Sequence, residues 1–201
     1  MQKRLFFFTI FFCLTNFIAL NSCMSSGHLA PAGEKTVIMQ NEAIEAFSAA
    51  QKYESKKNYT AAIECYEKSM EYDKLYDSAY YKIGRCYALM GEWKRAEYIF
   101  SAILAKDAGN SSIKDSLGFV YANSGRPELA EEIYSSLAAE NPYNADFSYK
   151  YIKILLQNGK TAEASSAFSL FKETFPRNRE EIKTLSHLLL EQQGNSDISA
   201  D

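Results

Sequence analysis

The chain has 201 residues, of which 47% are apolar and 23% are charged, and its formal net charge at pH 7 is -3. With only 9 glycines and 4 prolines there are few turn positions, which disfavours a β-rich fold and favours a mostly helical one. The acidic balance, without a run of more than two basic residues, excludes the basic surface that nucleic-acid binding requires.

The first 22 residues have the pattern of an export signal, because a lysine and an arginine near the start precede an apolar run over residues 5–20. This run is shorter than the roughly 20 apolar residues of a membrane-spanning helix. It ends in LNSC, residues 20–23, which resembles the lipobox of bacterial lipoproteins. The resemblance implies that residues 1–22 are removed and that Cys23 carries a diacylglyceryl group and an N-acyl chain. Ordinary secretion and an uncleaved anchor are the alternatives.

Residues 23–40 are expected to form the lipidated start and a flexible tether, because they begin rich in Ser, Gly, Ala and Pro and lack helical periodicity. A coil of this length reaches about 20–25 Å, which would hold a folded domain clear of the lipid headgroups. Met24 differs from the Asp-type signal for inner-membrane retention, so the lipoprotein resemblance implies an outer-membrane anchor that faces the periplasm. Asn41 is expected to cap the first helix.

An alanine recurs at an unbroken spacing of 34 residues, and an aromatic residue stands four positions after each alanine. The resulting frames are 43–76, 77–110, 111–144 and 145–178. In each frame, residues at positions 4, 7, 8 and 11, and again at 20, 24, 27 and 28, predict two amphipathic helices. A glycine at position 15 of frames two to four suits the left-handed residue that ends the first helix, whereas Lys57 stands there in frame one. The recurring alanines are Ala62, Ala96, Ala130 and Ala164.

This pattern resembles the tetratricopeptide repeat, and frame two matches it best. The resemblance implies an all-α, right-handed superhelical solenoid of four helix–turn–helix units in a domain that spans residues 41–193. Residues 179–193 continue the first-helix pattern and are expected to form a capping helix, followed by a disordered tail over 194–201. Ile152 replaces the small residue at position 8 of frame four and is expected to push its helix pair apart. The matching residues of frame two are Tyr80, Ile83, Gly84, Tyr87, Gly91, Trp93, Ala96 and Phe100.

Tetratricopeptide arrays bind peptides or helices of partner proteins on a concave surface built from first-helix positions 2, 5, 9, 12 and 13. Carried onto this sequence, these positions give a groove of aromatic and charged side chains, and aromatic residues and Arg are the types that dominate binding hot spots. The alternative is that some of the aromatic side chains pack within the superhelix. The predicted groove residues are Phe47, Tyr81, Arg85, Asp115, Phe119, Tyr149 and Lys153.

No catalytic constellation is visible in the sequence, so we expect neither an enzyme nor a cofactor or metal site. His28 and His187 are far apart in the sequence and neither has a second candidate ligand nearby. Cys65 and Cys86 lie on neighbouring predicted helices. Two buried thiols are expected there, and a disulfide is the alternative.

Together these features predict a non-catalytic protein-binding scaffold that is lipid-anchored in the bacterial cell envelope and assists assembly of an outer-membrane or secretion complex. The alternative is an accessory subunit of an exported enzyme or solute transporter, whose groove holds a partner helix or a small ligand. Recovery of barrel or secretin subunits with the protein would favour the first hypothesis. Recovery of a transporter component would favour the second.

Overall fold

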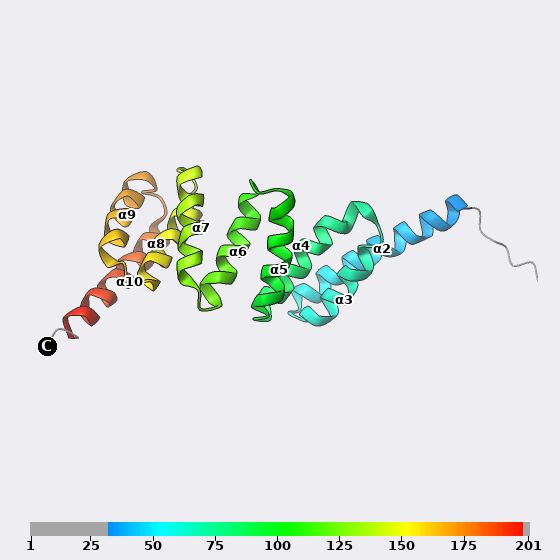
Figure 1. Ribbon diagram of the computed structural model, residues 1–201, viewed down its shortest axis with the longest axis horizontal. Coiled ribbons are helices and arrows are strands. Elements are labelled where there is room, and N and C mark those ends of the chain that lie inside the picture. The colour runs from blue at the N-terminus through cyan, green and yellow to red at the C-terminus, as the bar shows by residue number, and fades with distance from the viewer. Residues whose placement is uncertain (1–31, 199–201) are drawn as a thin grey trace, which may run out of the picture. The chain divides into compact units, whose positions relative to one another are not determined.

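The computed structural model describes residues 32–198, and all of the regular structure in this range is α-helical (Figure 1). This confirms the all-α class that the sequence predicts. The predicted signal segment 1–22 and Cys23 lie outside the described residues. The helices are α2 (Ala32–Ser55), α3 (Tyr59–Ser69), α4 (Asp73–Leu89), α5 (Trp93–Lys106), α6 (Ser111–Asn123), α7 (Pro127–Glu140), α8 (Ala145–Gln157), α9 (Thr161–Thr174) and α10 (Arg179–Ile198).

From Gln40 onward the chain forms one compact unit, in which consecutive helices from α3 to α10 pack side by side. The pairs α4/α5, α6/α7 and α8/α9 fall in the second, third and fourth sequence frames. Additional contact joins α8 to α10, so α10 takes the place of a further first helix. No helix among the described residues is both long enough and apolar enough to cross a membrane.

Both ends of the helical series extend further than the sequence predicts. Residues 32–40, expected as a flexible tether, belong to α2, so Asn41 lies inside this helix and does not cap it. Pro31 lies just before α2, and Gly33 stands in its first turn, after which the helix contains neither glycine nor proline. At the other end α10 continues to Ile198, into the predicted disordered tail, because a lone glycine costs a helix only about 1 kcal/mol.

Three asparagine side chains cap the N-termini of helices. The Asn58 side chain accepts a hydrogen bond from the backbone N–H of α3, Asn110 does so for α6, and Asn144 does so for α8. Each cap satisfies an N–H group that has no partner within its helix. The caps of α6 and α8 fix where the first helices of repeats three and four begin.

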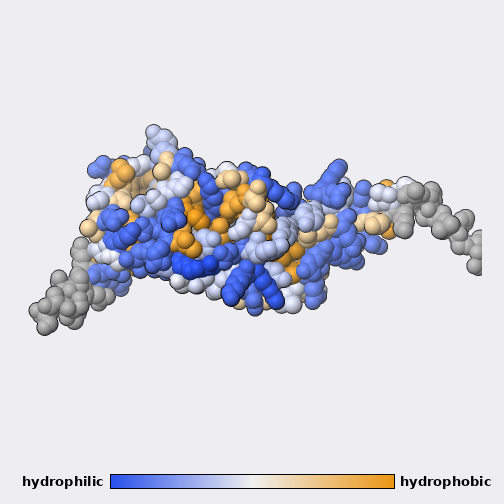
Figure 2. Space-filling model, viewed as in Figure 1, coloured by the Kyte–Doolittle hydropathy of each residue, from blue (hydrophilic) through white to orange (hydrophobic). Residues whose placement is uncertain are grey.

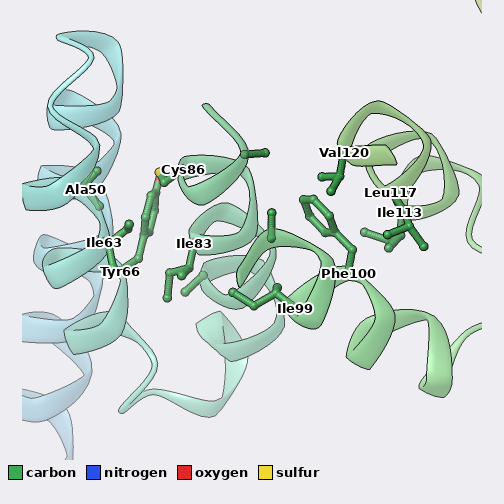
Figure 3. Close-up of a cluster of buried hydrophobic side chains, with 14 residues drawn as sticks. Ala50, Ile63, Tyr66, Ile83, Cys86, Ile99, Phe100, Ile113, Leu117 and Val120 are labelled. Atoms are coloured by element: carbon green, nitrogen blue, oxygen red, sulfur yellow. The ribbon is translucent and has the colours of Figure 1, made fainter. Parts of the chain in front are cut away.

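The aromatic residue at position 24 of each repeat fills the space between helices. Tyr66, Phe100, Tyr134 and Phe168 all have exposed fractions of 7% or less. Figure 3 shows Tyr66 beside Cys86 of α4, and Phe100 beside Val120 of α6. A Cβ at Gly84 would lie 2.8 Å from the Phe100 ring, so the small residue at position 8 lets the helices approach closely.

The fourth repeat has a large residue at position 8, where the other repeats have a small residue that lets the two helices approach closely. Ile152 is 1% exposed and belongs to a cluster that includes Phe168 of α9 and Leu185 of α10. The contact between α8 and α9 is less extensive than the contact within either preceding pair, as expected for a bulky side chain at this position.

Candidate functional site

The first helices of repeats two and three enclose a small pocket, which we call the α4–α6 pocket. Its volume is about 230 Å³. Four of the seven predicted groove residues meet there, namely Tyr81 and Arg85 of α4 and Asp115 and Phe119 of α6. The full lining is Tyr81, Arg85, Ala88, Leu89, Phe100, Asp115, Ser116, Phe119 and Lys150.

Helical spacing explains why these side chains share one surface. On α4, residues 85, 88 and 89 lie four, seven and eight positions after residue 81, which places all four on one face of the helix. Asp115 and Phe119 are four residues apart on α6 and therefore also lie on one face. The pocket thus forms where the same faces of two successive first helices meet.

Two apolar side chains at this pocket remain accessible to solvent. Phe119 is 44% exposed and Leu89 is 48% exposed. The ring of Phe119 makes an edge contact with the Trp93 ring, with centroids 6.3 Å apart. Figure 2 shows one face of the molecule, on which apolar residues gather in patches between polar ones. Exposed apolar side chains at a hollow are the usual mark of a binding surface.

Tyr81 is held more firmly than Phe119. Its ring lies against Phe100, with centroids 6.0 Å apart, and its hydroxyl is 3.5 Å from the Ser116 hydroxyl. Tyr81 is half-buried, so the two predicted aromatic groove residues of this pocket differ in role. Phe119 offers a free apolar surface, whereas Tyr81 forms part of the wall.

Lys150 is a residue of the pocket that the sequence analysis missed. Its Nζ lies 2.7 Å from Asp115 Oδ1 and 2.7 Å from Asp146 Oδ2. Burial lowers the pKa of Lys150, but the hydrogen bonds to these two carboxylates outweigh it and hold the pKa above its ordinary value. Asp115 is therefore engaged by an internal cation, which leaves it less able to bind a basic group of a ligand.

Glu54 stands at groove position 12 of repeat one, although it is not among the seven predicted groove residues. Its carboxylate accepts hydrogen bonds from the Tyr66 hydroxyl at 2.7 Å and from Lys82 Nζ at 3.3 Å. Arg85 Nη2 lies 3.6 Å from the same carboxylate, and the Arg85 side chain is 42% exposed. Burial and the hydrogen bond to Glu54 raise the pKa of Tyr66. Arg85 is thus the loosely held cation of the α4–α6 pocket.

The other three predicted groove residues lie outside this pocket. Phe47 packs on Tyr66, with ring centroids 5.2 Å apart, which agrees with the alternative that some aromatic groove positions are part of the core. Tyr149 lines a separate, acidic cleft of about 950 Å³ between α8 and α10. Lys153 stands over the Tyr149 ring and lines a third cleft, of about 600 Å³. The structure therefore divides the predicted groove into separate hollows.

Within the described residues there is no group of three His, Cys, Asp or Glu side chains placed to hold a metal ion. His187 is exposed and its Nδ1 lies 3.4 Å from Glu191. Cys65 and Cys86 are free thiols, but only Cys86 is buried, whereas Cys65 is half-buried. Burial raises the pKa of Cys86 to about 11, which keeps it protonated near neutral pH.

Comparison with known proteins agrees with this geometry. A tetratricopeptide repeat family model matches residues 53–117 and 121–189. Among solved structures, YrrB, described as "a TPR protein with an unusual peptide-binding site", is 23% identical, with a TM-score of 0.56, over 82% of this chain and 93% of that chain.

Two further solved structures share the fold. A tetratricopeptide repeat protein from Parabacteroides merdae is 19% identical, with a TM-score of 0.66, over 78% of this chain and 62% of that chain. The type III secretion translocator chaperone SycD from Yersinia enterocolitica is 22% identical, with a TM-score of 0.52, over 65% of this chain and 88% of that chain. A comparison with curated proteins gives no significant match.

Proposed function

Because the chain belongs to the tetratricopeptide repeat family, we propose that it is a non-catalytic scaffold that binds a partner protein through the α4–α6 pocket. The observation that carries this proposal is the exposure of Phe119 and Leu89 at a hollow that also contains the loosely held Arg85. An apolar anchor beside a cation with spare hydrogen-bond donors suits a peptide or helix with an apolar side chain next to an acceptor group. The peptide-binding site named for YrrB and the chaperone role named for SycD support this use of the fold.

The proposal is tested by truncating the exposed anchor. Phe119→Ala is expected to leave the thermal midpoint nearly unchanged, because the side chain is 44% exposed, and to reduce partner capture from solubilised cell envelopes. Leu170→Ala is the matched control, since Leu170 is 64% exposed but lies on α9, away from the pocket. If Phe119→Ala unfolds the protein and the fraction that stays folded still captures the partner, then Phe119 belongs to the core and the site is wrongly placed.

A second part of the proposal is that the scaffold is anchored in the bacterial envelope by lipid on Cys23, in the outer membrane and facing the periplasm. Its support is the sequence of residues 1–23, with a short basic start, a short apolar run and the lipobox-like LNSC. Two or more acyl chains hold a protein firmly on a membrane, whereas one chain gives only marginal binding. An anchored scaffold would serve the assembly of an outer-membrane or secretion complex.

Replacing Cys23 by Ser is expected to move the protein from the membrane fraction to the soluble fraction, because the described helices cannot span a bilayer. Fractionation followed by mass measurement of the N-terminus checks this. Ser22→Ala keeps a small residue before the cysteine and is the control that should stay membrane-bound. If the Cys23→Ser protein still sediments with membranes and keeps residues 1–22, an uncleaved anchor explains the localisation instead.

A further inference from the structure

A second hollow lies on the opposite side of α4, between α3 and α5, and we call it the tyrosine cleft. Its volume is about 470 Å³. Its α4 residues 80, 83 and 87 point about 130° away from residues 81, 85 and 88, given 100° per residue. The tyrosine cleft is therefore separate from the α4–α6 pocket. It is lined by Glu67, Met70, Tyr80, Ile83, Tyr87, Lys94, Arg95, Tyr98 and Ile99.

One aromatic side chain of this cleft is more exposed than folding requires. Tyr98 is 73% exposed and stands at position 22 of its repeat. The other repeats have Glu64, Glu132 and Ser166 at this position, which are residue types suited to a solvated helix face. Tyr98 is thus an aromatic residue at a position where the other repeats have polar side chains suited to solvent.

The walls of the cleft are supported by further ring contacts. Tyr80 stacks on Tyr76, with centroids 6.0 Å apart and planes at 27°. The Arg95 guanidinium lies over the Tyr87 ring, 5.3 Å from its centroid. Tyrosines held in this way can accept an apolar side chain without first losing much rotamer freedom.

The net charge of the residues that line the cleft is positive. Lys94 and Arg95 are exposed, and neither forms an ion pair with any described residue, whereas Arg126 and Lys160 on later repeats both do. Glu67 is the one carboxylate among the lining residues. A cleft between α7, α8 and α9 of repeats three and four, of about 370 Å³, has no charged side chain in its lining. The tyrosine cleft differs from this cleft in carrying cations.

We propose that the tyrosine cleft is a second protein-binding site, which takes a peptide segment with an apolar side chain flanked by Asp or Glu. The apolar side chain would enter between Tyr80 and Tyr98, and the carboxylates would meet Lys94 and Arg95 at the rim. Complementary charge of this kind sets specificity and the rate of association. A hollow suits an inserted side chain better than it suits the flat surface of a lipid bilayer, so a peptide is favoured over an anionic membrane.

The test uses a random peptide library displayed on phage and selected on the full chain in mild detergent. We expect one class of selected peptides to be enriched in Asp and Glu beside a large apolar residue. Its affinity should fall by about tenfold or more in Tyr98→Ala and in the double variant Lys94→Glu, Arg95→Glu, and stay unchanged in Phe119→Ala. Replacing the acids of such a peptide by Lys should restore binding to the double variant.

The same variants separate this proposal from the first one. Peptides whose binding depends on Phe119 alone bind at the α4–α6 pocket. Whether such peptides are found tests only the proposal for that pocket. The tyrosine cleft proposal is overturned if no selected peptide needs Tyr98, or if those that need it are not enriched in acids. It is also overturned if Lys94 and Arg95 are needed only for binding to phosphatidylglycerol vesicles. The varied side chains are all exposed, and circular dichroism verifies that the variants remain folded.

Discussion

At the residue scale, the turn after the first helix of each repeat shows how a local conformation constrains the sequence. Gly91, Gly125 and Gly159 have φ angles of 73° to 78°, and Lys57 has a φ of 59° at the same position. A side chain in this left-handed region costs about 1–2 kcal/mol, because its Cβ approaches the following carbonyl oxygen. The first repeat therefore carries local strain that the other three avoid.

Lys57→Gly is expected to stabilise the protein by about 1 kcal/mol, after allowing for the greater backbone entropy that glycine loses on folding. Urea unfolding measures the change. Lys56→Gly is the control, because Lys56 does not have a positive φ and should gain nothing. Equal stability changes in the two variants would mean that the left-handed conformation of Lys57 carries no cost.

At the scale of helices, an ion pair recurs between successive repeats. Arg126 at position 16 of repeat three binds Glu97 at position 21 of repeat two, with Nη2 and Oε2 2.8 Å apart. Lys160 and Glu131 repeat this pairing one frame later, at 2.6 Å. Hydrogen bonds from the cations hold the pKa values of Glu97 and Glu131 below their ordinary value.

These lowered pKa values predict a stability that depends on pH. A carboxylate with a lower pKa in the folded than in the unfolded state stabilises the fold above its unfolded pKa, and the contribution is lost as the pH falls through the folded pKa. At pH 7 the urea midpoint of the wild type should therefore be higher than that of the double variant Glu97→Gln, Glu131→Gln. This difference should shrink as the pH falls through the lowered pKa values of the two carboxylates.

The control for this measurement is Glu132→Gln. Glu132 is exposed on α7 and forms no ion pair with a described residue, so its variant removes a charge without removing a contact. Its difference from wild type should change little with pH. If the urea midpoints of wild type and the double variant still differ by the same amount at low pH, the two ion pairs do not act through their charges.

The sequence predicted the repeating helices better than their ends or their charges. The frames were recoverable because a spacing of 34 residues fixes which side chains face the neighbouring helix. The end of α10 could not be predicted from the sequence, because no proline or capping residue marks it. Lys150, which forms ion pairs with Asp115 and Asp146, stands at position 6, which is not a groove position, whereas Glu54 stands at groove position 12 of repeat one. One signal was present, since Lys82 and Lys150 both stand at position 6 of their repeats and both reach a carboxylate of the preceding repeat.

At the scale of the whole molecule, stability is distributed over separate clusters along the series of helices. One cluster runs from α2 to α6, and another joins α8, α9 and α10. In the second cluster Leu185 of α10 is fully buried. A repeat array with contacts mainly between neighbours can lose structure at one end while the rest stays folded.

Leu185→Ala is expected to destabilise the C-terminal end by about 2–5 kcal/mol, because it leaves a cavity under α10. Hydrogen exchange should become faster in α8, α9 and α10 and remain unchanged in α3, α4 and α5. Leu190→Ala is the matched control, since Leu190 lies on the same helix and is 67% exposed. Faster exchange throughout the chain would instead indicate one cooperative unit.

The stacking of α3 to α10 chiefly on their neighbours also has a mechanical consequence. A pulling force along the series of helices acts on every junction, as it does on springs in series. Each junction extends according to its own stiffness, and the extensions add. A ligand bound across α4 and α6 would stiffen the two junctions that it spans, α4/α5 and α5/α6. The remaining junctions would keep their elasticity, and the protein would still yield under tension while it holds its partner.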